Sequence, residues 1–270
     1  DCANGASFET SPKAVRKLGA ELLVISNDPD GLNINRNCGS THLEMLKNYT
    51  VDNGCDVGLA FDGDADRVLA VDEEGHVVDG DKIMAIIGLS LKNKGLLKDH
   101  TIVATVMSNL GFDVMAKEND LHIIKASVGD RYVLEKMLEG DFVLGGEQSG
   151  HIIIRTHNTT GDGLVTALQL LSVMKESGRK LSELAGVMTI FPQVLRNARV
   201  SNAKKNDYLN DPIIAGKCRE LEETFRGEGR VLIRPSGTEP LVRVMIEGRD
   251  QQFITAKAEE LVKLIEERLG

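Results

Sequence analysis

Three aspartates stand at alternate positions directly after a predicted buried strand. The strand covers residues 56–61, and the run that follows it reads Asp62-Gly63-Asp64-Ala65-Asp66-Arg67. If this loop curls, its carboxylates can converge on one cation, and ligands made only of oxygen suit Mg²⁺ or Ca²⁺ better than Zn²⁺. The sequence therefore predicts a divalent metal site formed by Asp62, Asp64 and Asp66. Arg67 would lie beside the metal, where a guanidinium can steady a transferring phosphoryl group.

Two other interpretations of these aspartates are open. In an EF-hand loop, Glu73 would supply the last ligand, but Arg67 occupies the position that requires glycine, and strands rather than helices flank the run. The second alternative is an acidic surface turn. Three carboxylates packed against an apolar strand repel one another unless a cation neutralises them, so we favour the metal site.

A second loop is rich in glycine and carries three polar side chains. After the predicted strand 141–145, the sequence reads Gly145-Gly146-Glu147-Gln148-Ser149-Gly150-His151. The glycines allow the backbone to approach a ligand closely. Glu147 and Ser149 have side chains of the kind that hydrogen-bond sugar hydroxyls, and His151 can transfer a proton near neutral pH. Taken alone, the loop fits a ligand-binding segment and an ordinary glycine-rich hairpin equally well.

A third loop joins two predicted strands and is flanked by arginines. It reads Arg234-Pro235-Ser236-Gly237-Thr238-Glu239-Pro240-Leu241-Val242-Arg243. Two hydroxyls, backbone N–H groups and two guanidinium groups make a plausible phosphate cradle, although the loop lacks the lysine and the following helix of a Walker P-loop. The alternative is a hairpin turn with solvated arginines. We favour the phosphate cradle because it would restore local positive charge to an acidic protein.

The elements that must position these loops alternate along the chain. The first block is predicted to contain a helix over 12–18, a strand over 21–25, a helix opened by the capping box Thr41 to Glu44, the strand 56–61 and a hairpin of 68–72 with 76–78. The second contains helices 81–93, 109–118 and 130–138 between strands 101–106, 121–126 and 141–145, then a long helix from 163 to about 175 and a short helix over 180–186. The third contains strands 193–200, 229–234 and 241–247 with helices 208–225 and 250–269.

This order of elements predicts the fold class. Strands separated by helices pair in parallel through right-handed crossovers, whereas the last block has one adjacent pair of strands. We expect an α/β protein: two α/β domains with mixed or parallel sheets, residues 1–79 and 80–193, followed by a smaller α+β C-terminal domain, residues 194–270.

Composition excludes several classes of function. The chain has 270 residues and a formal net charge of −9, so its field repels nucleic acid, and no apolar run reaches the length of a membrane span. Its four cysteines are scattered without a C-x-x-C pair, which favours reduced thiols over a disulfide framework. Asp1 to Gly5 resembles the polar end of a strand, so we expect the natural N-terminus upstream.

The three loops, in this order on three successive blocks, resemble those of the α-D-phosphohexomutase superfamily. The D-G-D-A-D-R and G-G-E-Q-S-G-H forms, together with Asn37 to His42 and Thr159 to Gly163, are similar to the bacterial branch that acts on glucosamine phosphate. Relatives that act on mannose and glucose phosphates more often carry D-G-D-G-D-R and G-E-M-S-G-H. The resemblance covers essentially the whole chain.

The resemblance implies a reaction and a role for each loop. Members of the superfamily isomerise hexose 1- and 6-phosphates through a phosphoserine enzyme and a bisphosphorylated intermediate. By resemblance, Asp62, Asp64 and Asp66 bind Mg²⁺, and Arg67 and His151 act in catalysis. The substrate-binding residues would be Glu147, Ser149, Arg131, Arg234, Ser236, Gly237, Thr238 and Arg243. Arg131 is also explained by its place at the start of a helix.

The sequence departs from the superfamily pattern in one respect. The first domain, with its T-A-S-H-N-P-type loop and nucleophilic serine, has no counterpart, and Ser108 lacks the neighbours that would make it one. We therefore expect the chain to lack mutase turnover by itself and to need the missing N-terminal domain as its partner. A glucosamine phosphate mutase is the first expectation for the parent protein. Phosphomannomutase or phosphoglucomutase activity, and a non-catalytic phosphosugar-binding remnant, are the alternatives.

The expected partners follow from the resemblance and from the composition. They are a hexosamine phosphate substrate and Mg²⁺, with no nucleic acid and no membrane; a homodimer is left open. The substrate class and the thiols favour a cytoplasmic location.

Overall fold

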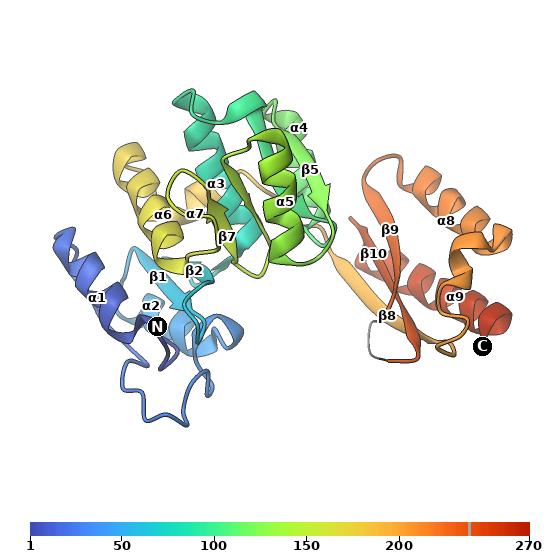
Figure 1. The fold of residues 1–270 in the computed structure, drawn as a ribbon, viewed down its shortest axis with the longest axis horizontal. Helices are drawn as coiled ribbons and strands as arrows, with labels where there is room; N and C mark the ends of the chain where they lie inside the picture. The colour runs from blue at the N-terminus through green and yellow to red at the C-terminus, as the bar shows by residue number, and fades with distance from the viewer. Residues whose placement is uncertain (237–238) are drawn as a thin grey trace. The chain divides into compact units, whose positions relative to one another are not determined.

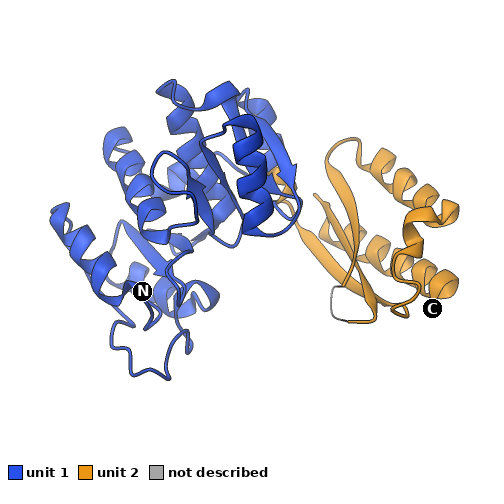
Figure 2. Cartoon of the chain, in the orientation of Figure 1, with its two compact units in different colours: residues 1–108, 112–189 blue, residues 109–111, 190–270 orange. Residues whose placement is uncertain are grey.

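The computed structural model describes residues 1–236 and 239–270. The chain forms two compact units, residues 1–108 with 112–189 and residues 109–111 with 190–270 (Figure 2). Gly237 and Thr238, both predicted to hold phosphate, lie outside the described residues.

A small antiparallel sheet in unit 1 holds the aspartate loop. Its strands are β1 (Val57–Phe61), β2 (Val68–Asp72) and β3 (Val77–Val78), in the order β1-β2-β3. Phe61 pairs with Val68, so residues 62–67 form the connection between β1 and β2. The predicted hairpin of β2 and β3 is confirmed. Helices α1 (Ser7–Lys17) and α2 (Glu44–Asp52) and the 3₁₀ turn η1 (Gly39–Thr41) complete this part.

Three local predictions in this part are wrong. Helix α1 begins at Ser7, five residues before the predicted start, and Pro12 lies inside it. Residues 21–25 form no strand; a strand needs a hydrogen-bonded neighbour, and the one backbone bond given for this segment runs from the Cys2 N–H to the Ile25 carbonyl. Helix α2 begins at Glu44, so its N-cap is the apolar Leu43 and it has no side-chain cap; Thr41 ends the preceding 3₁₀ turn, and its hydroxyl lies 3.0 Å from the His42 ring.

The larger sheet of unit 1 has the order β5-β4-β6-β7. Its strands are β4 (Thr101–Thr105), β5 (His122–Ala126), β6 (Leu144–Gly146) and β7 (Ile152–Ile154). The predicted parallel pairing is confirmed for β5, β4 and β6. Strand β7, which the sequence analysis missed, returns antiparallel to β6, so the glycine-rich loop is a hairpin turn.

Helices cover both faces of this sheet (Figure 1). They are α3 (Gly80–Asn93), α4 (Leu110–Glu118), α5 (Asp130–Gly140), α6 (Gly163–Ser177) and α7 (Leu181–Ala185); the 3₁₀ turn η2 (Lys98–His100) precedes β4. Ile102 and Ala104 of β4 pack with α3, α4, α6 and α7, whereas Val103 between them packs with α5. This alternation follows from the period of two in a strand, and it explains why every residue of β4 is buried.

Unit 2 has an antiparallel sheet with two helices against one face. The sheet order is β8-β10-β9, with β8 (Gln193–Arg199), β9 (Gly229–Pro235) and β10 (Leu241–Gly248). Val242, Val244 and Ile246 of β10 are buried in the same core as α8 (Pro212–Phe225) and α9 (Gln251–Leu269). The alternate residues of β10 therefore belong to the other face of the sheet. The 3₁₀ turn η3 (Asp207–Asn210) precedes α8. The predicted α+β architecture is confirmed.

Asn109 and the first two residues of α4 belong to unit 2, although the rest of α4 belongs to unit 1. The Asn109 amide donates to the Phe191 carbonyl at 3.0 Å and to the Glu247 carboxylate at 3.1 Å, and its oxygen accepts the Phe191 N–H at 2.9 Å. Glu247 is fully buried and also pairs with Arg230. A buried carboxylate requires such partners, so this network fixes the start of β8 against β10.

Candidate functional site

The aspartate loop is a tight connection whose two ends bond to each other. The Asp62 N–H donates to the Arg67 carbonyl at 3.4 Å, and the Arg67 N–H donates to the Asp62 carboxylate at 3.2 Å. At the tip, Ala65 has φ +63°, a left-handed conformation that is costly for a residue with a Cβ. The strands therefore hold the loop in one curled shape.

Asp62 and Asp66 lie next to each other in this loop, and Asp64 does not join them. Burial and then the neighbouring Asp66 carboxyl raise the pKa of Asp62. One Asp66 oxygen, Oδ1, is buried and has no hydrogen-bond partner among the described residues. Asp64 is exposed at the tip. Within residues 1–236 and 239–270, no group of at least three His, Cys, Asp or Glu side chains could hold a metal ion.

The arrangement thus differs from the predicted trio of converging carboxylates. A third carboxylate beside the Asp62 and Asp66 pair would add like-charge repulsion, which an exposed position avoids. The pair nevertheless has the hard oxygen donors that Mg²⁺ prefers, and the orphaned buried oxygen of Asp66 fits a cation. Arg67 Nε is 4.0 Å from Asp62 Oδ2, and its side chain is partly exposed.

The glycine-rich turn between β6 and β7 presents Glu147 and Ser149. Glu147 accepts the backbone N–H of Gly129 at 3.0 Å with one carboxylate oxygen and the Ser149 hydroxyl at 3.2 Å with the other. Ser149 is exposed, and Glu147 is partly exposed. A carboxylate held by two donors keeps a fixed direction, as a group that recognises sugar hydroxyls requires.

His151 brings the first two loops together. It forms an isolated bridge with Arg67, and the Val68 N–H donates to the Gly150 carbonyl at 3.2 Å. The His151 ring is 4% exposed; its Nδ1 lies 3.0 Å from Asp66 Oδ2, and its Nε2 accepts the Gly161 N–H at 3.1 Å. The His151 ring therefore lies between Asp66 of the aspartate loop and the backbone of Gly161, and both of its nitrogens are in hydrogen bonds.

Two neighbouring segments were not assigned to the site by the sequence analysis. Gly163 donates its N–H to the Ala65 carbonyl at 3.0 Å, so the start of α6 packs on the tip of the aspartate loop. Asp162 caps α6 by accepting the Val165 N–H at 2.9 Å. Gln148 donates to the Asp79 carboxylate at 3.1 Å, and burial raises the pKa of Asp79. The glycines on either side of Asp162 were the signal that a close backbone approach occurs here.

Arg131 lies on the first turn of α5, two residues from the Gly129 N–H that Glu147 accepts. Its guanidinium bonds Glu135 at 2.9 Å, and the side chain is 81% exposed. The hydrogen bond to Glu135 raises the pKa of Arg131. The structure thus brings Arg131 near the sugar loop only through its backbone.

In unit 2, Arg234 of β9 and Arg243 of β10 are direct cross-strand partners. Residues opposite each other share a face of the sheet, and like charges there repel. The Arg243 guanidinium bonds Glu239 at 3.2 Å, and the buried Ser236 hydroxyl accepts the Glu239 N–H at 3.1 Å. Lys205 adds a third cation by donating to the Ser236 carbonyl at 2.8 Å, which the sequence analysis missed.

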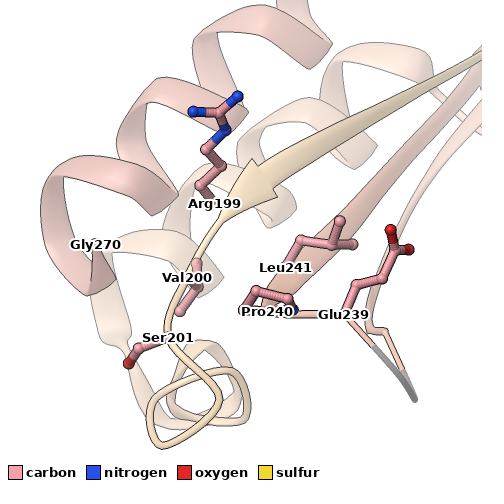
Figure 3. Close-up of a pocket in the computed structure, with 7 residues that line it drawn as sticks. All are labelled: Arg199, Val200, Ser201, Glu239, Pro240, Leu241 and Gly270. Atoms are coloured by element: carbon pink, nitrogen blue, oxygen red, sulfur yellow. The ribbon is translucent and has the colours of Figure 1, made fainter.

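A cavity of about 400 Å³ lies at the end of this sheet (Figure 3). It is lined by Arg199, Val200, Ser201, Glu239, Pro240, Leu241 and Gly270. Arg234 and Arg243 do not line it, and the Arg199 side chain points away from Glu239 in the figure. The facing arginines and this cavity are therefore separate features.

Comparison with known proteins identifies the family. Three models described as phosphoglucomutase/phosphomannomutase match in order: alpha/beta/alpha domain II over residues 1–75, alpha/beta/alpha domain III over 79–191 and the C-terminal domain over 195–264. The chain belongs to the phosphoglucomutase/phosphomannomutase family.

Within this family, the chain is similar to curated phosphoglucosamine mutases. The phosphoglucosamine mutase of Acetivibrio thermocellus is 66% identical over all 270 residues, and that of Clostridium novyi is 59% identical over 268 residues, or 99% of the chain. The chain spans 60% of the length of each of these relatives.

Solved structures of phosphohexomutases share the fold. The N-acetylphosphoglucosamine mutase of Aspergillus fumigatus, in complex with GlcNAc-6P and magnesium, has a TM-score of 0.79 at 20% identity, covering 100% of this chain and 61% of that one. A phosphoglucomutase/phosphomannomutase family protein of Burkholderia thailandensis has a TM-score of 0.77 at 21% identity, covering 97% of this chain and 60% of that one.

Among the described residues, no helix has both the length and the apolar character needed to cross a membrane.

Proposed function

We propose that the protein containing this chain interconverts glucosamine 6-phosphate and glucosamine 1-phosphate. In this reaction a phosphoserine outside these 270 residues would donate its phosphoryl group to the free hydroxyl of the sugar, giving a bisphosphate. The intermediate then turns, and the serine takes back the other phosphoryl group. The observation that carries the proposal is the meeting of the aspartate loop and the sugar loop at Asp66 and His151. The 66% identity to a phosphoglucosamine mutase supports the choice of sugar.

We propose Mg²⁺ as the cofactor, held by Asp62 and Asp66 with Asp64 as a third ligand from the loop tip. The buried Asp66 Oδ1 and the oxygen-only donor set support this assignment. The ion supplies Lewis-acid polarisation of the transferring phosphoryl oxygens. Arg67, whose guanidinium is partly exposed beside Asp62, would neutralise charge on the same group.

Glu147 and Ser149 would hold the sugar hydroxyls, with Arg131 at the edge of the same loop. Their shared hydrogen bond and the Gly129 N–H orient the carboxylate before substrate arrives. In unit 2, the residues that would grip the phosphate that is not reacting are Arg234, Ser236, Gly237, Thr238 and Arg243. Two arginines placed opposite each other gain most from a bound dianion, because it removes their mutual repulsion.

We further propose that these 270 residues alone have no mutase turnover, because the family domains that they match are II, III and the C-terminal one, and the nucleophilic serine is expected outside them. Sugar phosphates are charged metabolites that do not cross membranes freely, which favours a cytoplasmic location.

Kinetics of the full-length protein test the proposal. We expect the highest kcat/KM on glucosamine 6-phosphate, with glucose 6-phosphate and mannose 6-phosphate as the matched comparisons. A preference for glucose or mannose phosphate would replace the proposed substrate. Absence of turnover on all three sugars, with phosphosugar binding retained, would favour a non-catalytic binding role. Measurable conversion by the isolated chain would refute its proposed inactivity.

A further inference from the structure

The contacts of His151 define which of its nitrogens carries the proton. A backbone N–H can only donate, so the Gly161 N–H, 3.1 Å from Nε2, requires that nitrogen to be an acceptor. The neutral ring then carries its proton on Nδ1, which lies 3.0 Å from Asp66 Oδ2. Both contacts are satisfied by the Nδ1–H tautomer alone, in which the ring donates to Asp66.

The backbone at Gly161 is pressed against the ring, so this arrangement has little freedom. A Cβ at Gly161 would lie 2.4 Å from both Cε1 and Nε2 of His151. Two residues later, a Cβ at Gly163 would lie 2.6 Å from the Arg67 carbonyl. The segment between them carries the cap of α6, so the start of a long helix anchors both contacts. Only glycine lets the backbone donor reach the ring from this distance.

The ring in turn fixes the Asp66 carboxylate. Its bond to Oδ2 leaves Oδ1 buried and without a hydrogen-bond partner among the described residues. Carboxylates that bind metals are commonly oriented in this way, by a hydrogen bond to the oxygen that is not bound to the ion. With 4% exposure and both nitrogens engaged, His151 has no free nitrogen with which to exchange a proton with a sugar.

We propose that His151 is a positioning residue: the Gly161 N–H sets its tautomer, and its Nδ1–H turns Asp66 so that Oδ1 faces the divalent cation. The inference rests on the proposed metal site, and it replaces the sequence-based expectation that His151 transfers a proton to the substrate. The Gly161-Asp162-Gly163 segment thereby becomes part of the metal centre without touching the ion.

Nitrogen NMR of the full-length protein tests the tautomer directly. With ¹⁵N-labelled histidine and assignment by loss of the signal in His151→Gln, we expect a protonated Nδ1 and an unprotonated Nε2 at neutral pH. Proton occupancy on Nε2, or a ring that exchanges freely with water, would overturn the proposal. This measurement needs neither substrate nor activity.

Mn²⁺ binding, followed by electron paramagnetic resonance, tests the orienting role. The amide N–H of His151→Asn occupies nearly the place of Nδ1–H, whereas that of His151→Gln lies near Nε2. We expect His151→Ala and His151→Gln to lose about 10–100-fold in Mn²⁺ affinity, and His151→Asn to recover most of the loss. His122→Ala, an exposed histidine on β5, is the control and should bind as the unaltered protein does.

The outcomes separate the two proposals. Equal Mn²⁺ affinity in all His151 variants, with binding by the unaltered protein intact, would overturn the positioning role and leave the metal site standing. Equal loss in His151→Asn and His151→Ala would overturn it as well. Failure of the unaltered protein to bind Mn²⁺ would overturn both proposals. A different sugar specificity would affect neither the proposed metal site nor the positioning role of His151.

Discussion

Arg243 of β10 lies directly opposite Arg234 of β9, so two like charges face each other across neighbouring strands. Such a pair opposes folding by about 0.2–1 kcal/mol in the absence of an anion. The Arg243 Nε is buried and without a hydrogen-bond partner among the described residues. A contact that opposes folding in this way is expected where the two side chains serve to bind a ligand rather than to stabilise the fold.

Replacing one of these arginines should separate stability from binding. We expect Arg234→Gln to raise the free energy of unfolding slightly, by up to about 1 kcal/mol, because it removes the repulsion and leaves the Arg243–Glu239 ion pair in place. The same variant should lose the thermal stabilisation that glucosamine 6-phosphate gives the unaltered protein. Thermal unfolding with and without the ligand measures both effects. Arg219→Gln, an exposed arginine on α8, is the control, and an equal ligand response in both variants would contradict the phosphate role.

Asp62 should make stability depend on pH. Its pKa is raised in the folded chain by burial and then by Asp66, so its contribution is fully present below the unfolded pKa and is lost as pH rises through the folded pKa. In the presence of a chelator, Asp62→Asn should therefore match the unaltered protein at acid pH and melt at a higher temperature near neutral pH. Asp64→Asn, at the exposed tip of the same loop, is the matched comparison. A difference in melting temperature that is constant from about pH 3 to about pH 8, a range that extends well above the ordinary carboxyl pKa of about 4, would refute the raised pKa.

Ser149 should matter for substrate and little for the fold. Its side chain is exposed, and its hydroxyl makes one hydrogen bond, at 3.2 Å, to Glu147. Ser149→Ala in the full-length enzyme should leave the melting temperature nearly unchanged. Loss of a hydroxyl bond to the sugar, worth about 1 kcal/mol, should lower kcat/KM about fivefold. Unchanged kcat/KM on glucosamine 6-phosphate would remove Ser149 from the site.

Two glycine-to-alanine changes should act in opposite directions. In Gly163→Ala the new Cβ would lie 2.6 Å from the Arg67 carbonyl and 2.9 Å from that of Ala65, so the aspartate loop must shift. We expect a loss of about 1–3 kcal/mol, together with weaker Mn²⁺ binding. Gly216→Ala, on α8 with nothing within 4 Å of its Cβ, should gain about 0.5–1 kcal/mol from helix propensity. Denaturant titrations compare the two, and equal effects would show that the close approach at Gly163 carries no energy.

The parallel sheet and the three loops could be predicted from the sequence because each depends on local pattern. Apolar runs between helical segments fix β4, β5 and β6, and glycine clusters mark the loops. The sequence analysis missed strand β7 because its three consecutive isoleucines do not alternate with polar residues. Residues 21–25 have the composition of a strand, but they pair with no strand among the described residues.

The exact geometry of the site depends on contacts between distant residues, which local pattern does not encode. The exposure of Asp64, the burial of His151 and the approach of Gly161 each follow from where α6 meets the aspartate loop. A motif shows that a histidine is near the chemistry, but its role depends on what lies on each side of the ring. The sequence analysis missed Lys205 for the same reason, because its hydrogen bond to Ser236 joins residues 31 positions apart.

The Asn109 network has a consequence for dissecting this protein. Because residues 109–111 lie with the C-terminal unit, the polypeptide passes between the units at three places rather than one. A piece cut out at residue 190 would leave Phe191 and the buried Glu247 without the amide that bonds both. The C-terminal unit is therefore a discontinuous module, and swapping it between relatives requires grafting the three-residue insert along with it.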